Sequence, residues 1–105
     1  MKIIKVVYTV KPEFAVINTD NIKLVMNDLR NINHPGISYN ACLGSDGKTF
    51  THTAFFRSDE EKKLLNDLPS FKYFQEQLKM GGLEVAPKQD LLQLVGSSVD
   101  ILSNE

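Results

Sequence analysis

The chain has 105 residues, of which 42% are hydrophobic and 24% charged, which suits one globular domain over residues 1–105 and is too short for two. Its 12 Lys and Arg residues against 13 Asp and Glu residues give a formal charge of -1 without a long run of either sign, which argues against nucleic acid or an anionic membrane as partner. The chain has a single cysteine, Cys42, no apolar run near the ~20 residues of a membrane span and no signal-peptide pattern, so we expect a cytoplasmic protein.

Large residues alternate over the first ten positions, which predicts a strand over residues 2–10. One face of this strand is strongly apolar and carries Ile4, Val6, Tyr8 and Val10. The other face is mixed and carries Ile3, Lys5, Val7 and Thr9.

A helix is predicted after Pro12, because the missing N–H of proline is tolerated in a first helical turn. We expect Thr19 or Asp20 to cap or restart this helix and residues 33–36 to end it, since Pro35 resists helix continuation. The apolar stripe of the helix comprises Ile22, Val25, Leu29 and Ile32.

Asp46-Gly47 lies between two runs of strand-forming residues and predicts a β-hairpin over residues 37–57. A two-residue type I′ turn at this dipeptide would need positive φ at both positions. Ser45 then pairs with Lys48 beside the turn. The next four cross-strand pairs are Leu43 with Phe50, Ala41 with His52, Tyr39 with Ala54, and Ile37 with Phe56.

Those four pairs share one hairpin face, which is apolar except for the hydroxyl of Tyr39 and the imidazole of His52. We expect helices to pack against this face and bury it in the core. No remaining segment of the chain is expected to cover the opposite face. The opposite face is small and hydroxylated, with Ser38, Asn40, Cys42, Thr49, Thr51, Thr53 and Phe55.

A second helix is predicted to begin at Ser58, because Glu61 follows three residues later in a capping-box pattern. Pro69 should interrupt this helix, and Ser70 should cap its second segment. Two glycines, at positions 81 and 82, should end it.

The last third of the chain is predicted to contain one short strand. Residues 83–88 include Pro87 and are expected to form a loop, whereas residues 90–95 are rich in Leu and Val and are expected to form the strand. A tail over residues 99–105 follows, in which the apolar side chains can dock.

The element order is therefore strand, helix, strand, strand, broken helix, strand. This is the βαββαβ order of a ferredoxin-like α+β fold, with a four-stranded antiparallel sheet and both helices on one face.

On this element order, on the interrupted helix segment SFKYFQEQLKMGG and on the ending PKQDLLQLVGSS, the chain resembles the dimeric α+β barrel superfamily. That superfamily includes antibiotic-biosynthesis-type monooxygenases, haem-degrading monooxygenases and stress-responsive barrel proteins. The resemblance covers almost the whole chain and contains no catalytic signature. It implies that two sheets pack through their open faces into the barrel of a homodimer, with a ligand cavity between helices and sheet in each subunit.

His52 and Tyr39 are the candidate ligand-binding residues, because they place polar groups on an apolar face beside the small side chains of Ala41 and Ala54. An imidazole there can bind an aromatic or carbonyl ligand or act as a base. The alternative is a buried histidine that is satisfied by Tyr39 or by the backbone.

Other polar residues give weaker signals for a site. The register places Asn40 on the opposite face from His52. Asn18 and Asn21 on the first helix are alternative polar groups for the cavity side, although we expect them to face solvent. His34 is expected to lie at a helix end or in solvent, and the spacing of the two histidines does not indicate a metal site. The sequence contains no cofactor-binding motif, and no catalytic residue is assigned.

Two functions are compatible with these patterns. The first is a protein of the dimeric barrel type that binds a small apolar or aromatic molecule, with a cofactor-independent, monooxygenase-like activity as one outcome. The second is a non-enzymatic structural or stress-responsive dimer. A deep cavity beside Tyr39 and His52 favours the first, and a filled core favours the second.

Overall fold

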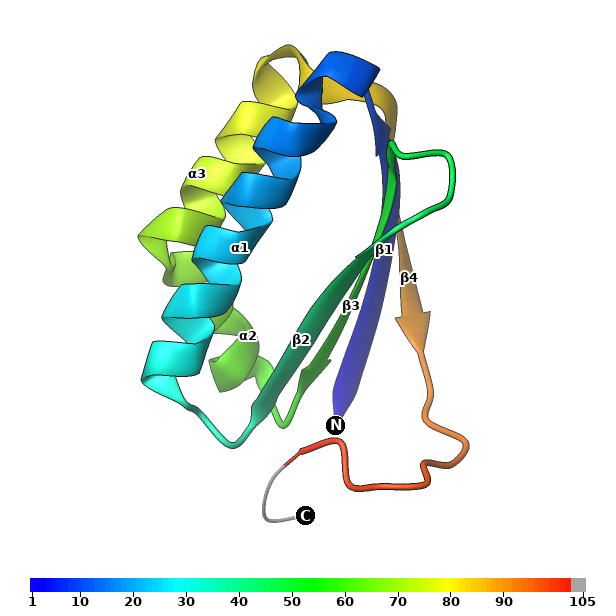
Figure 1. Cartoon of the computed structure of the whole chain (residues 1–105). Coiled ribbons are helices and arrows are strands. Elements are labelled where there is room, and N and C mark those ends of the chain that lie inside the picture. Colours follow the sequence, from blue (N-terminus) through cyan, green and yellow to red (C-terminus); the bar gives the residue numbers. More distant parts are fainter. Residues whose placement is uncertain (103–105) are drawn as a thin grey trace.

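The computed structural model of the chain describes residues 1–102, and Figure 1 shows the helices packed on one face of a curved sheet. The sheet is antiparallel with strand order β2-β3-β1-β4, so the predicted ferredoxin-like α+β fold is confirmed. The strands are β1 (Lys2–Val10), β2 (Ile37–Leu43), β3 (Thr49–Phe56) and β4 (Leu83–Leu92). The helices are η1 (Pro12–Phe14), α1 (Ala15–Ile32), α2 (Asp59–Asp67), α3 (Pro69–Gln77) and the π-turn η2 (Leu78–Gly82).

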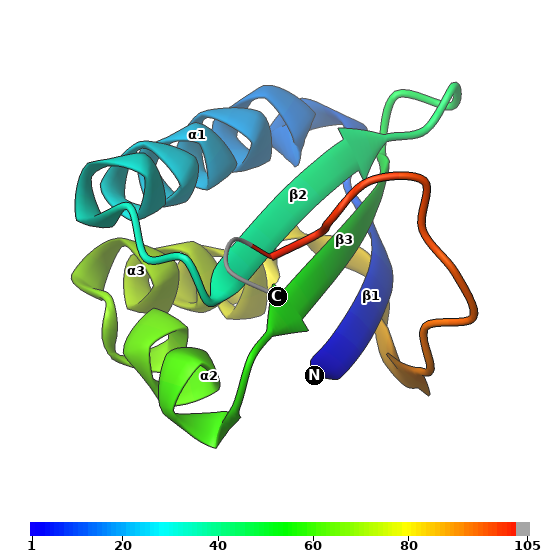
Figure 2. The ribbon, with the colours of Figure 1, turned by 90° about the horizontal axis from the view of Figure 1, so that it is seen from below.

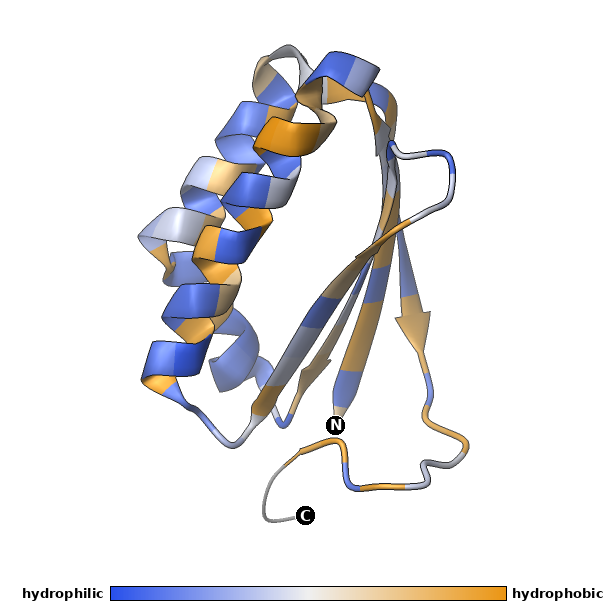
Figure 3. Cartoon of the chain, viewed as in Figure 1, coloured by the Kyte–Doolittle hydropathy of each residue, from blue (hydrophilic) through white to orange (hydrophobic). Residues whose placement is uncertain are grey.

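The core lies between the helices and one face of the two central strands. Tyr8 pairs with Phe50 and Val6 with His52 between β1 and β3, so their side chains share the face that the helices cover. Hydrophilic and apolar segments follow one another along β1 in Figure 3, and adjacent apolar residues such as Ile3 and Ile4 place apolar side chains on both faces of this strand. The buried members of this core are Ile4, Tyr8, Val10, Ile22, Val25, Phe50, Ala54, Phe56, Leu65, Phe71, Phe74 and Leu78.

The first helix runs without interruption, so the predicted cap at Thr19 or Asp20 is wrong. The Thr19 hydroxyl donates to the carbonyl of Ala15, one turn earlier, and is therefore compatible with the helix interior. The helix ends at Asn33, which adopts φ 52° and ψ 45° and whose N–H donates to the carbonyl of Leu29.

The predicted break in the second helix is confirmed. Ser58 caps α2 by accepting from the N–H of Glu60, and its hydroxyl donates to the Glu61 carboxylate. Leu68 is extended between α2 and α3, and Pro69 takes the first position of α3. The predicted cap at Ser70 is wrong, because Ser70 lies inside the first turn of α3.

The last strand is longer than the sequence predicted. The expected loop over residues 83–88 and strand over 90–95 are replaced by β4, which pairs with β1 from Leu83 to Leu92. The register shifts between the pairs of Val7 and Thr9, so a bulge falls beside Pro87. An edge strand tolerates proline at an irregularity of this kind, because no second neighbour needs its N–H.

The C-terminal tail covers one end of the sheet face that lies away from the helices, which corrects the expectation that no chain remains for it. Figures 1 and 2 show the tail passing beneath the end of the sheet where β1 begins and β3 ends. Leu102 is 1% exposed and Ile3 on that face is 5% exposed, so the tail does dock. Residues 103–105 of the predicted tail lie outside the described residues.

The hairpin has the predicted register but a different turn. The predicted pairs from Ile37–Phe56 to Leu43–Phe50 are present, whereas the predicted Ser45–Lys48 pair is absent from the ladder. The Gly47 N–H donates to the carbonyl of Gly44, which makes the loop longer than two residues. Gly47 has φ 75°, and Asp46 does not have positive φ, so the type I′ prediction is wrong. The carboxylate of Asp46 instead accepts from the N–H groups of Lys48 and Thr49, and these bonds hold the longer loop.

Gly47 provides a test of this loop. Replacing Gly47 by Val should lower the free energy of unfolding by roughly 1–2 kcal/mol, because a β-branched residue resists positive φ. Gly47→Asn should lower it less, since Asn tolerates this region, and a Cβ atom at this position would have no atom within 4 Å. Urea denaturation of the three proteins measures the difference, and equal midpoints for Val and Gly would contradict the turn geometry.

Candidate functional site

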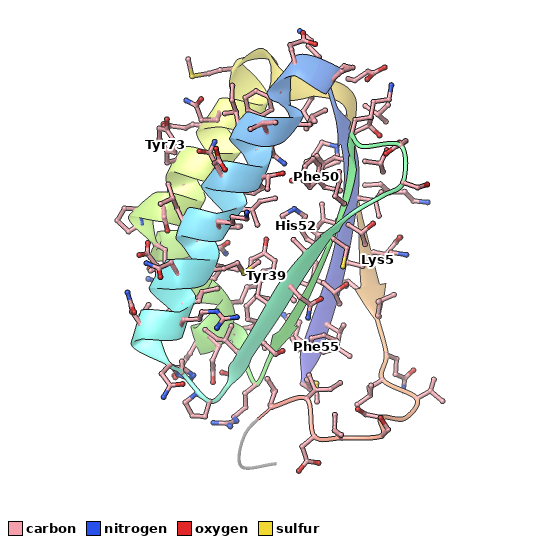
Figure 4. The ribbon with its side chains drawn as sticks, in the orientation of Figure 1. Lys5, Tyr39, Phe50, His52, Phe55 and Tyr73 are labelled. Carbon is pink, nitrogen blue, oxygen red and sulfur yellow. The ribbon has the colours of Figure 1, made fainter. Side chains whose placement is uncertain are left out.

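His52 lies at the centre of a group of polar side chains buried between sheet and helices. Figure 4 shows His52 and Tyr39 in the space between the sheet and the helices, whereas Lys5 and Phe55 lie on the other side of the sheet. The imidazole is 4% exposed, and its two nitrogens contact hydroxyls from the strands on either side of β3. Nε2 lies 2.7 Å from the hydroxyl of Tyr8 on β1, and Nδ1 lies 2.6 Å from the hydroxyl of Tyr39 on β2.

Asn18 of α1 extends these contacts into a chain of hydrogen bonds. Its Nδ2 donates to the Tyr8 hydroxyl over 2.8 Å, and the side chain is fully buried. The expected solvent exposure of Asn18 and Asn21 is therefore wrong, because both residues occupy the sheet-facing side of α1. The resulting chain runs from Asn18 through Tyr8 and His52 to Tyr39.

With Asn18 Nδ2 as the donor, one direction follows for the remaining hydrogen bonds. Because Tyr8 accepts from Asn18, its own hydrogen is available for Nε2 of His52. A neutral imidazole then carries its hydrogen on Nδ1 and donates it to the oxygen of Tyr39. The hydroxyl hydrogen of Tyr39 has no further acceptor among residues 1–102, so a bound molecule can accept it.

The donor and acceptor roles in this chain of hydrogen bonds can also be reversed. The Oδ1 atom of Asn18 is buried without a hydrogen-bond partner in the described part of the chain. If the amide turns over, Oδ1 accepts from Tyr8, Nε2 donates to Tyr8, and Tyr39 donates to Nδ1. Tyr39 would then accept a hydrogen bond from a ligand. The Tyr39 hydroxyl can therefore pair with a ligand oxygen that accepts a hydrogen bond or with a ligand hydroxyl that donates one.

Burial keeps these groups uncharged near neutral pH. It lowers the pKa of His52 to about 4, because the apolar surroundings disfavour the imidazolium. Burial also raises the pKa of Tyr8 and of Tyr39 well above the usual value for a phenol. The side chains in this chain of hydrogen bonds are therefore neutral donors and acceptors.

A cavity of about 280 Å³ adjoins this chain of hydrogen bonds. Phe71 and Phe74 of α3 contribute aromatic walls, and the ring centres of His52 and Phe74 lie 5.5 Å apart. Exposed Gln75, Lys79 and Gln89 also line the cavity, so it opens to solvent on their side. A cavity of this size, with apolar walls and few polar groups, suits a small aromatic molecule.

The other sequence-derived candidates lie apart from this cavity. Asn40 lies on the face away from the helices, as the register predicted, and Cys42 is exposed. His34 accepts a hydrogen bond from the N–H of Gly36 at the end of α1, which is a local structural contact. Within residues 1–102, no three His, Cys, Asp or Glu side chains gather as a metal site, and no helix is long and apolar enough to cross a membrane.

Tyr8 is the part of this arrangement that the sequence analysis missed, and Asn18 was considered for the cavity side only as an alternative to solvent exposure. The diagonal neighbour relation of Tyr39 and His52 followed from the hairpin register alone. The ferredoxin-like strand order also predicts that β1 lies beside β3, which places Tyr8 on the face of His52. No sequence pattern distinguishes Asn18 from a solvent-facing helix residue, because it interrupts the apolar stripe.

The same fold occurs in solved structures of very different sequence. The chain superposes on a candidate antibiotic biosynthesis monooxygenase of Bacteriodes thetaiotaomicron with a TM-score of 0.81 and 12% identity, covering 94% of this chain and 93% of that one. It matches Rv0793 of Mycobacterium tuberculosis with a TM-score of 0.76 and 13% identity over 93% and 98% of the two chains. A further antibiotic biosynthesis monooxygenase superposes with a TM-score of 0.73 and 10% sequence identity, covering 91% of this chain and 100% of that one.

These superpositions cover nearly the full length of each protein. The chain therefore has the fold of the antibiotic biosynthesis monooxygenases, in agreement with the resemblance found in the sequence. No protein-family model and no curated protein matches the sequence.

The depressed pKa of His52 predicts how stability depends on pH. Between pH 6.5 and 4 the unfolded chain binds a proton at His52 that the folded chain resists, so stability falls as the pH falls. Above pH 6.5 both states are neutral at this residue. The contribution lost by pH 4.5 is about 2–3 kcal/mol.

His52→Gln is the matched variant, because an amide offers a donor and an acceptor but does not titrate. Urea denaturation at several pH values should show the stability of the two proteins converging as the pH falls. Parallel profiles would show that His52 titrates in the folded protein as it does in the unfolded chain.

Proposed function

We propose that this chain is a small-molecule-binding protein whose cavity between α3 and the sheet holds a small aromatic or carbonyl-bearing ligand. The hydroxyl of half-buried Tyr39 carries the proposal, because in the first of the two hydrogen-bond directions its hydrogen is free beside a cavity with aromatic walls. His52 contributes indirectly, since both of its nitrogens already bond to tyrosines and its role is to orient Tyr39. The presence of a cavity favours this function over a filled structural core.

The reaction that fits this site is oxygenation without a cofactor. Tyr39 would donate to a ligand carbonyl and stabilise the enolate that forms when an adjacent carbon loses a proton to solvent. That electron-rich carbon then reacts with dioxygen. A methylene group is oxidised to a carbonyl while one oxygen atom of O₂ enters the product and the other leaves as water. The fold shared with antibiotic biosynthesis monooxygenases supports this proposal.

A non-enzymatic, stress-responsive or structural dimer is the second candidate. The observation that favours it is the complete satisfaction of His52, which leaves the imidazole without a nitrogen for a substrate. Ligand binding without turnover would support this candidate.

Both functions include a homodimer formed through the sheet face that lies away from the helices. The tail covers only one end of this face, where half-buried Phe55 pairs with Ile3, and half-buried Val7 lies near its centre. Val85 and Leu92 of β4 pair with residues of the same face and are 57% and 44% exposed. An apolar sheet surface of this extent favours burial against a second copy about a two-fold axis.

Binding of 2-indanone, an aryl-fused ketone, tests the cavity. Tyr39→Phe should weaken its binding roughly five- to tenfold, because one neutral hydrogen bond is lost. Tyr73→Phe is the matched control, since Tyr73 lies on the outer side of α3 (Figure 4) and is 49% exposed. Isothermal titration calorimetry measures both, and equal affinity in the wild type and Tyr39→Phe would remove Tyr39 from the site.

Turnover is measured with the same compound under ¹⁸O₂. The proposal expects one labelled oxygen in indane-1,2-dione, formed faster with wild-type protein than with Tyr39→Phe. Binding without labelled product would support the non-enzymatic function.

Thr53→Arg tests the dimer. Thr53 lies opposite Lys5 on the proposed interface, so the added guanidinium would place like charges together and weaken association by about tenfold or more. Asn27→Arg adds the same side chain to the exposed side of α1 and should leave association unchanged. Analytical ultracentrifugation over a concentration series is the measurement, and a wild type that stays monomeric at tens of micromolar, roughly, would contradict the dimer.

A further inference from the structure

We propose that the ligand of the cavity between α3 and the sheet is an aromatic carboxylate, and that Lys79 at the mouth of the cavity binds its carboxylate group. The inference rests on the function proposed above and names the class of ligand that this function would take. Tyr39 binds an oxygen atom at the inner end of the ligand, and Lys79 binds the outer end. Lys79 is therefore assigned as a residue that determines ligand specificity.

The polar side chains at the mouth of the cavity come from two elements. Gln75 lies on α3, and Lys79 follows one helical turn later in η2, so the two side chains share one side of the helix. Gln89 of β4 pairs with Val6, which places its side chain on the sheet face that the helices cover. The mouth therefore lies on the helix side of the sheet, whereas the proposed dimer uses the opposite face.

The mouth of the cavity carries a single positive charge. Among residues 1–102, Lys79 is the only charged residue that lines the cavity, and it forms no salt bridge with another described residue. His52 and the two tyrosines of the cavity are neutral near neutral pH, because burial disfavours their charged forms. An anionic group on the ligand would complement this charge.

The charge and the neighbouring amides of the mouth favour a carboxylate over a phosphate. The ammonium group of Lys79 is a compact point charge, which can bind one oxygen of a carboxylate. The amides of Gln75 and Gln89 can donate hydrogen bonds to the other oxygen. A phosphate monoester carries close to two negative charges, and no second cation among the described residues lines the cavity.

The separation of the two ends of the cavity suits a small aromatic acid. The Tyr39 hydroxyl lies 2.6 Å from Nδ1 of His52 and is therefore close to β3. Because β1 lies between β3 and β4, Gln89 is two strand spacings farther on, or roughly 10 Å. Phe71 and Phe74 of α3 line the same cavity. A fused aromatic ring with a ketone at one end and a carboxylate at the other spans a distance of this order and would pack against these two side chains.

The test compares 2-oxoindane-5-carboxylate with its neutral amide, 2-oxoindane-5-carboxamide. Both compounds keep the ketone that Tyr39 is proposed to bind. In isothermal titration calorimetry at low salt, the acid should bind the wild type about fivefold more tightly than the amide, as expected for a solvent-exposed ion pair. This preference should disappear at about 1 M NaCl, where the Debye length falls to about 3 Å. Equal affinities at low salt would overturn the proposal.

Three variants locate the charge that the acid requires. Lys79→Gln should abolish the preference for the acid and leave the affinity for the amide unchanged. Lys79→Arg keeps the charge and should retain the preference. Lys23→Gln removes a cation from an exposed position of α1 that does not line the cavity, so it should also retain the preference. A preference that persists in Lys79→Gln would place the carboxylate elsewhere and overturn the assignment.

Binding of 2-indanone distinguishes a failure of this inference from a failure of the proposed function. If 2-indanone binds in a manner that depends on Tyr39, whereas the acid and the amide bind equally, only the assignment of Lys79 falls. Tyr39→Phe should also weaken binding of the acid, and an unchanged affinity would show an ion pair at the surface and overturn the inference. No binding of any of the three compounds would overturn both proposals.

Discussion

The structure depends on the need to satisfy one imidazole inside an apolar core. His52 projects from the middle strand pair toward the helices, where an unpaired nitrogen would be costly. The hydroxyls of Tyr8 and Tyr39 form hydrogen bonds with the two nitrogens, and Asn18 donates to Tyr8. Four elements of the fold therefore contribute to one group of hydrogen bonds. Partial loss of such a group leaves buried polar atoms without partners, which is why its members are coupled energetically.

This coupling also explains the character of the cavity. Because the imidazole is enclosed by its partners, it does not present a free base to a ligand, and in the function we propose the hydroxyl of Tyr39 recognises the ligand. The arrangement differs from a site in which histidine itself contacts the substrate. It gives a neutral donor whose orientation is fixed by residues behind it, which favours selective binding of an oxygen atom over strong acid–base catalysis.

The sequence was informative where local geometry decides the outcome. The alternation in residues 37–57 predicted the hairpin register, and with it the proximity of Tyr39 and His52. Prediction was wrong where a side chain or a long-range pairing changed the local preference. The Asp46 carboxylate stabilised a longer loop than its dipeptide indicated, and pairing with β1 drew residues 83–88 into a strand despite Pro87. The burial of Asn18 depends on Tyr8, which lies on another element, so no helical pattern reveals it.

The sequence separations within the hydrogen-bonded group have a consequence for the order of folding. Tyr39 and His52 are 13 residues apart, and Asn18 and Tyr8 are 10 apart, so each of these contacts closes a short loop. Tyr8 and His52 are 44 residues apart and join the β1–α1 unit to the hairpin. Two local units can therefore form with part of their polar contacts in place. Docking of the two units forms the contacts between residues that are far apart in the sequence, and it removes the imidazole from water.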